Sequence, residues 1–102
     1  MRDLHNKARG EVPLEIDGRN VRLCVTLGAL AELEAAFDVG SLGELGDRLA
    51  RLTASDLIVV LSALSAGGGE ALTTAQLAAA RIDAKAAAAA VAEAFRSAFD
   101  AA

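Results

Sequence analysis

The sequence predicts an α+β domain in which an N-terminal β-hairpin packs on a bundle of four to five short helices. Residues 11–25 alternate between apolar and polar on both sides of Asp17-Gly18, and an Asp-Gly pair between two alternating runs is typical of a hairpin turn. Residues 26–102 instead place apolar residues three and four positions apart, which is the spacing of amphipathic helices. An isolated hairpin is marginally stable in water, so we expect the helices to cover its apolar face.

The alternation in residues 11–25 puts six aliphatic side chains on one face of the predicted hairpin. Pro13 has no backbone N–H to donate to a neighbouring strand, which favours an edge position for the first strand. The expected cross-strand pairs are Ile16 with Val21, Leu14 with Leu23, and Val12 with Val25.

The predicted helices each begin at a side chain that can accept a bond from a backbone N–H. Ser41 and Glu44 have the spacing of a capping box, and Gly40 before them suits the end of the preceding helix. The three glycines at 67–69 are expected to end a helix and form a mobile linker. The predicted N-caps are Thr26, Ser41, Thr53 or Ser55, Thr73 or Thr74, and Asp83, and the second helix carries the apolar stripe Leu42, Leu45, Leu49 and Leu52.

The length of 102 residues suits one domain with a modest core. Residues 1–10 are polar and without periodicity, so we expect a flexible N-terminal segment there. Residues 11–102 are then a single α+β domain, with the hairpin in 11–25 and the helical part in 26–102.

The charge and composition argue against several classes of partner. The net charge is −4 and the chain has no Trp or Tyr, whereas nucleic-acid binders need clustered cations and often aromatic platforms. The longest apolar run, 86–92, is too short to span a membrane, and the charged N-terminus does not resemble a signal peptide. A single cysteine, Cys24, fits a reducing compartment, so we expect a soluble cytoplasmic protein.

No group of residues has the pattern of a catalytic or metal site. His5 is the only histidine and lies in the predicted flexible segment, without partners held in fixed geometry. Cys24 has only Arg22 nearby to depress its pKa, which is weak support for a reactive thiol. The glycines at 67–69 lack the Lys-Ser or Lys-Thr of a phosphate loop. We therefore expect no enzymatic activity, no cofactor and no metal.

Two helices have apolar surface that a partner could contact. The third is apolar nearly all round, so it is either central in the domain or touches another molecule. The last, predicted from Ala84 to about Phe99, has a wall of alanines that either packs internally or receives a partner helix. The predicted partner-binding residues are Ile58, Val59, Ala87, Val91, Phe95 and Phe99.

Three segments together resemble a known family. These are Arg9-Gly10-Glu11-Val12 with the Gly turn, Thr26–Glu34, and 52–57 (Leu-Thr-Ala-Ser-Asp-Leu), followed by the glycine break and the alanine-rich final helix. Over about residues 8–99 the chain is similar to a small family from gene transfer agents and related tailed phages. Members are described either as tail tube-associated proteins or as tail assembly chaperones.

The resemblance implies a non-enzymatic role in building a phage-like tail. A tail assembly chaperone would bind the long helical tape-measure protein and keep it soluble until tube subunits polymerise around it. Two alternatives remain: a tail tube or tip subunit retained in the particle, and a small dimeric adaptor that pairs through its third helix. Tube subunits usually supply long strands, and this sequence predicts only one short hairpin. Other tail proteins are the expected partners, in the cytoplasm of the producing bacterium or in the particle tail, with homo-oligomers as a further possibility.

Overall fold

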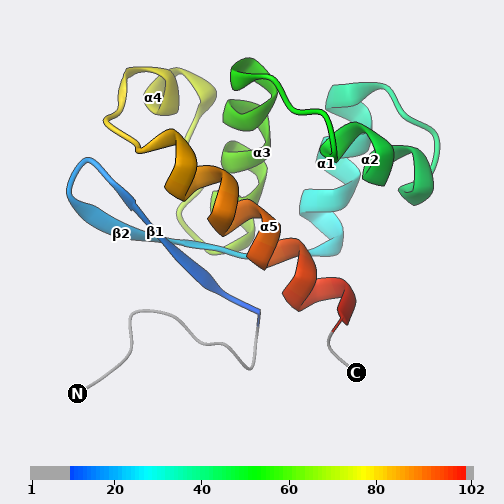
Figure 1. Cartoon of the computed structure of the whole chain (residues 1–102), viewed down its shortest axis with the longest axis horizontal. Coiled ribbons are helices and arrows are strands. Elements are labelled where there is room, and N and C mark those ends of the chain that lie inside the picture. The colour runs from blue at the N-terminus through cyan, green and yellow to red at the C-terminus, as the bar shows by residue number, and fades with distance from the viewer. Residues whose placement is uncertain (1–9, 101–102) are drawn as a thin grey trace.

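A computed structural model describes residues 10–100, so the predicted flexible segment lies outside the described residues except for Gly10, and so does His5. The predicted fold class is confirmed: an antiparallel hairpin precedes five helices (Figure 1). The elements are β1 (Val12–Ile16), β2 (Arg19–Leu23), α1 (Leu27–Phe37), α2 (Leu42–Leu49), α3 (Ala54–Gly67), α4 (Thr74–Ala79) and α5 (Ala84–Asp100).

The hairpin turn is as predicted, but the predicted register is wrong by two residues. Asp17 and Gly18 alone form the loop, with φ of 54° and 81°. Two successive residues with positive φ match the right-handed twist of the strands, which favours this tight turn over the four-residue loop that was expected. A shift of two residues keeps every side chain on its face. The observed pairs include Val12 with Leu23, Leu14 with Val21, and Ile16 with Arg19.

The apolar face of the hairpin is covered by α3 and α5, as the instability of an isolated hairpin requires. Figure 1 shows α5 crossing the molecule diagonally, and α5 contacts both strands and α3. Helix α3 lies at the centre, because it contacts α1, α4, α5 and β2. Its residues Val60, Leu61 and Leu64 are fully buried, so central burial is the correct one of the two interpretations of this helix.

The helix N-caps follow the predictions closely. Thr53 and Thr73 each complete a capping box, so they are the caps where the sequence left alternatives. The Ser41 hydroxyl accepts from the Glu44 N–H, but the Glu44 carboxylate accepts from the N–H of Gly40 rather than from that of Ser41. The other predicted caps, Thr26 and Asp83, accept from Ala29 N–H and Ala86 N–H respectively.

The prediction that Gly40 ends the first helix is wrong. Helix α1 ends at Phe37, and Asp38 adopts the left-handed conformation with φ of 54°. Aspartate is one of the few non-glycine residues that adopt this conformation readily, so it can end a helix without glycine.

The three glycines at 67–69 end α3 as predicted, but Gly67 and Gly68 pack closely against another segment of backbone instead of forming an open linker. A Cβ on Gly67 would overlap the carbonyl oxygen of Cys24, and one on Gly68 would overlap that of Arg22. The Cys24 N–H also donates to the Leu64 carbonyl at 3.0 Å. The C-terminal end of α3 therefore lies directly against the end of β2.

Helix α2 is joined to the rest of the domain through Arg48. The Arg48 guanidinium donates to both carboxylate oxygens of Asp56 on α3, with Nη2–Oδ1 at 2.9 Å, and lies 4.7 Å from the ring centroid of Phe37 on α1. These bonds and the Thr53 N–H lower the pKa of Asp56 from 3.8 to about 2. Only Leu45 of α2 is buried, so this polar contact is a main attachment of the helix.

Gly68→Ala should lower the free energy of unfolding by at least about 2 kcal/mol, because the new Cβ forces α3 away from β2. Gly46→Ala is the matched control: this helical glycine has no atom within 4 Å of its Cβ position, so alanine should stabilise by about 0.5–1 kcal/mol. Urea denaturation of both variants measures the difference. Equal effects of the two substitutions would contradict the close contact.

Asp56→Asn should destabilise the protein in a pH-dependent way. The pKa of Asp56 is lower in the folded protein, so its contribution is fully present above the unfolded pKa and is lost as the pH falls through about 2. The difference in unfolding free energy between wild type and variant should therefore shrink between about pH 4 and pH 2. Asp47→Asn, an exposed carboxylate on α2, controls for the charge change. A difference that stays constant with pH would exclude the ion pair as its cause.

Candidate functional site

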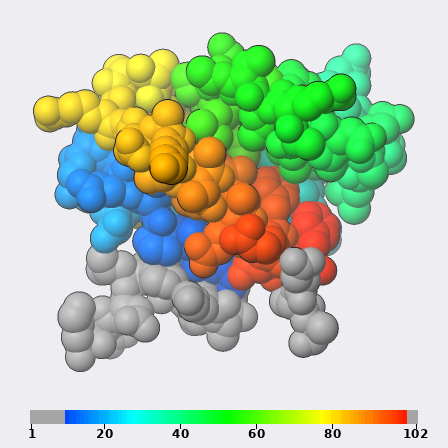
Figure 2. Space-filling view, in the orientation of Figure 1, coloured from blue at the N-terminus to red at the C-terminus, as the bar shows by residue number. Residues whose placement is uncertain are grey.

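An apolar groove of about 520 Å³ lies between the C-terminal end of α2 and the part of α5 from Ala88 to Phe99. In Figure 2 the orange-to-red surface of α5 borders the green surface of α2 and the residues that follow it. Nearly all of the lining side chains are aliphatic or aromatic, so the groove offers apolar surface to a partner. The lining residues are Gly46, Leu49, Ala50, Leu52, Ala88, Val91, Ala92, Phe95 and Phe99.

Helix α5 has an inner and an outer face. Ala87, Ala90 and Ala94 are buried, and α5 contacts β1, β2 and α3, so this part of the alanine wall packs inside the domain. Alanines permit such close packing because their side chains are short. Ala88 and Ala92 are exposed on the outer face, where they form part of the groove.

Two stacked phenylalanines form the C-terminal part of the groove. The Phe95 and Phe99 rings have centroids 6.2 Å apart and an interplanar angle of 5°. Phe95 is half-buried, whereas Phe99 is 57% exposed. A large exposed aromatic side chain beside an apolar groove is typical of a protein-binding surface.

The structure brings three of the six predicted partner-binding residues together. Val91, Phe95 and Phe99 line the groove. Ala87 is 1% exposed and belongs to the core. Ile58 and Val59 are half-buried on α3, packed against the core and outside the groove lining.

The residues that α2 and its following loop contribute to the groove were not predicted as a binding surface. Leu49 and Leu52 were assigned to the apolar stripe of the second helix, but of that stripe only Leu45 is fully buried. Leu42, at the start of α2, is 51% exposed. A four-leucine stripe on a short helix with two glycines was the available signal that some of its apolar surface stays uncovered.

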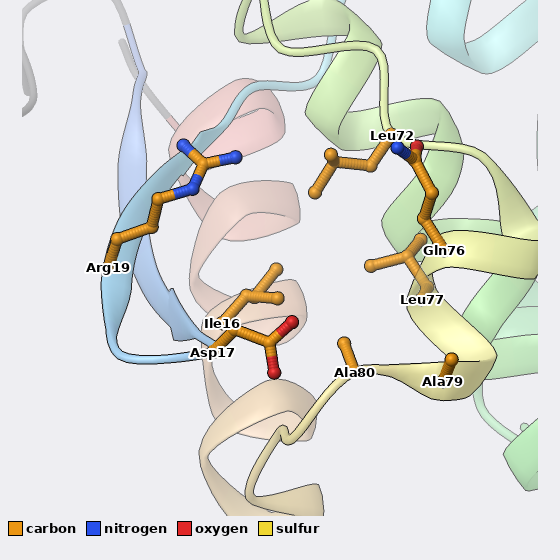
Figure 3. A pocket seen from close by; sticks show the side chains of 8 residues that line it. All are labelled: Ile16, Asp17, Arg19, Leu72, Gln76, Leu77, Ala79 and Ala80. Carbon is orange, nitrogen blue, oxygen red and sulfur yellow. The ribbon is translucent and has the colours of Figure 1, made fainter.

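A second hollow, of about 270 Å³, lies between the hairpin turn and α4 (Figure 3). Its polar groups serve structural contacts. Asp17 Oδ1 accepts from the Arg81 N–H at 2.7 Å, and the Asp17 N–H donates to the Arg81 carbonyl at 3.0 Å. Arg19 pairs with Glu70 at 3.4 Å across the hollow's edge. These bonds attach the hairpin turn to the segments on both sides of α4.

Within residues 10–100, no group of three or more His, Cys, Asp or Glu side chains is placed to hold a metal ion. Among the same residues no helix combines the length and the apolar character needed to cross a bilayer. Cys24 is half-buried just after β2.

Comparison with known families identifies the chain. A family model described as "Phage tail tube protein, GTA-gp10" matches residues 9–102. Comparison with curated proteins and with solved structures yields no match. The match to the family model covers nearly the whole chain and agrees with the resemblance to gene transfer agent and tailed-phage tail proteins. The protein therefore belongs to the GTA-gp10 family of phage tail tube proteins.

Proposed function

We propose that this protein is a non-enzymatic assembly factor for a phage-like tail, and that it binds a helical segment of the tape-measure protein in the groove between α2 and α5. Membership of the family supports a role connected with phage tails. The observation that carries the specific proposal is the stacked pair Phe95 and Phe99 at an apolar groove, with Phe99 57% exposed. The protein would act in the cytoplasm of the producing cell, before the particle is complete.

The dimensions of the groove suit a helix. Its α5 wall runs from Ala88 to Phe99, which corresponds to about 16 Å, or about three helical turns. Amphipathic helices commonly bind in such grooves through side chains at positions i, i+3 or i+4, and i+7. A long helical client presents many such segments, and covering them would keep it soluble.

The alternative is a structural subunit that stays in the tail, which the description of the family as a tube protein favours. The described residues contain one two-stranded sheet with five residues in each strand, which is little material for a ring-forming sheet. The adaptor that dimerises through its third helix has less support, because the main apolar stripe of α3 is buried inside the domain.

The test is co-expression of the full chain with the tape-measure protein, followed by size-exclusion chromatography of the soluble fraction. If the protein is a chaperone, the tape-measure protein should be insoluble alone and should elute with this protein when the two are co-expressed. A tape-measure protein that is soluble alone and forms no complex would contradict it. Recovery of this protein in purified particles, in amounts matching the tube subunit, would establish the structural alternative.

Phe99→Asp should abolish co-elution, or weaken binding at least about tenfold, while the circular dichroism spectrum and melting temperature stay near wild type. The exposed position of Phe99 makes the charge tolerable to the fold. Leu27→Asp is the matched control, because Leu27 is 83% exposed at the start of α1 and lies outside the groove lining. Retained co-elution in the Phe99 variant, or equal loss in both, would exclude the groove as the binding site.

A further inference from the structure

The outer edge of the groove on α5 carries two cations. Lys85 is three residues before Ala88, and Arg96 is four residues after Ala92, so helical spacing puts both beside groove-lining positions. Both side chains are exposed. Within residues 10–100 neither has an ion-pair partner, since the salt bridges there join Arg19 to Glu70 and Arg48 to Asp56.

The opposite edge, on the α2 side, does not neutralise these charges. Arg51 follows the lining residue Ala50, and Asp47 follows the lining residue Gly46. Glu93 follows Ala92 on α5. Because successive residues of a helix are about 100° apart around its axis, Glu93 lies further from the groove than Lys85 or Arg96 does. We call Lys85 and Arg96 the groove edge. Arg51 and Asp47 add one cation and one anion on the α2 side, so the groove keeps two unbalanced cations in a chain whose net charge is −4.

We infer that the groove selects amphipathic helices whose apolar stripe is flanked by aspartate or glutamate, which deepens and rests on the function proposed above. The apolar lining would take the stripe, and the basic groove edge would pair with the acidic flank. Lys85 and Arg96 are eleven residues apart, about 16 Å along α5. A helix lying along α5 meets both cations when its acidic residues are also about eleven positions apart.

The same charges disfavour two other occupants. A second copy that pairs through its own α5 would bring Lys85 and Arg96 against the same cations, which is repulsive. An anionic membrane surface matches the charge, but the apolar side chains form the walls of a groove. A helix reaches such walls more completely than a flat surface does.

Two synthetic peptides of about 16 residues test the inference. Both have leucines at i, i+3, i+4 and i+7, and their flanking residues are glutamate in one and glutamine in the other. Binding to the full chain is measured by isothermal titration calorimetry. At about 0.02 M salt the glutamate peptide should bind about five- to tenfold more tightly than the glutamine peptide, and this preference should mostly disappear at about 0.5 M salt.

The double variant Lys85→Gln with Arg96→Gln should remove this preference without changing the affinity for the glutamine peptide. Arg81→Gln is the matched control, because Arg81 has an exposed side chain outside the groove lining. Its effect on the preference should be negligible.

The other outcomes separate the inference from the proposed function. Equal affinity of wild type for both peptides would overturn the acidic preference and leave the groove as a helix-binding site. If neither peptide binds, the inference is overturned. The proposed function fails as well only if, in addition, the tape-measure protein does not co-elute with this protein. Concentration-dependent dimerisation that Phe99→Asp abolishes would assign the groove to a second copy. Co-sedimentation with phosphatidylserine vesicles that requires Lys85 and Arg96 would assign it to a membrane surface.

Discussion

The close backbone contact between the end of α3 and the end of β2 determines the arrangement of the domain. Gly67 and Gly68 lie against the carbonyl oxygens of Cys24 and Arg22, and the Leu64 carbonyl accepts the Cys24 N–H. No side chain larger than hydrogen fits at either glycine without moving one of the elements. Because α3 contacts β2 and three other helices, its position against the hairpin also places α1, α4 and α5. The groove depends on this contact indirectly, since α5 forms one of its walls.

The two walls of the groove are held by different kinds of interaction. Helix α5 packs on the hairpin and on α3 through buried alanines and Val91, which is a continuous apolar contact. Helix α2 fully buries only Leu45, packs Leu49 partly against the core, and is also held by Arg48, which contacts Asp56 and Phe37. A segment with few buried apolar contacts opens at lower free energy than one packed in the core. A partner that needs a wider groove would therefore displace α2 more easily than α5.

Most features that depend on neighbouring residues were predictable, except for the end of α1, and features that depend on distant contacts were not. The Asp17-Gly18 turn and the Thr53 cap follow from local chemistry. The strand register failed because the alternation of side chains is the same after a shift of two residues. The glycines at 67–69 were assigned to a linker because nothing in the sequence indicates that a strand end lies beside them.

In the candidate site, too, the features set by local spacing were predicted and those set by distant contacts were not. The spacing of Val91, Phe95 and Phe99 predicted one apolar surface, and these three residues do line the groove. Ala87 has a similar helical spacing but is buried, because the apolar surface of α5 is wider than the groove and its inner part faces the core. The contribution of Leu49 and Leu52 depends on where α2 lies relative to α5. That position depends on the packing of Leu45 and Leu49 and on the bonds of Arg48, and it is not encoded in either helix alone.

The distribution of phenylalanine supports the function that we propose for the groove. The chain has three phenylalanines, and none of them is among the buried residues of the core, which consists of aliphatic side chains and alanines. Phe95 and Phe99 line the groove, and Phe37 supports Arg48, the residue that attaches α2. Phe37 and Phe95 are partly buried against the core, whereas Phe99 is 57% exposed, so its ring is the one that the fold leaves uncovered. The position of Phe95 and Phe99 beside one groove is what the proposed binding of a helical partner requires.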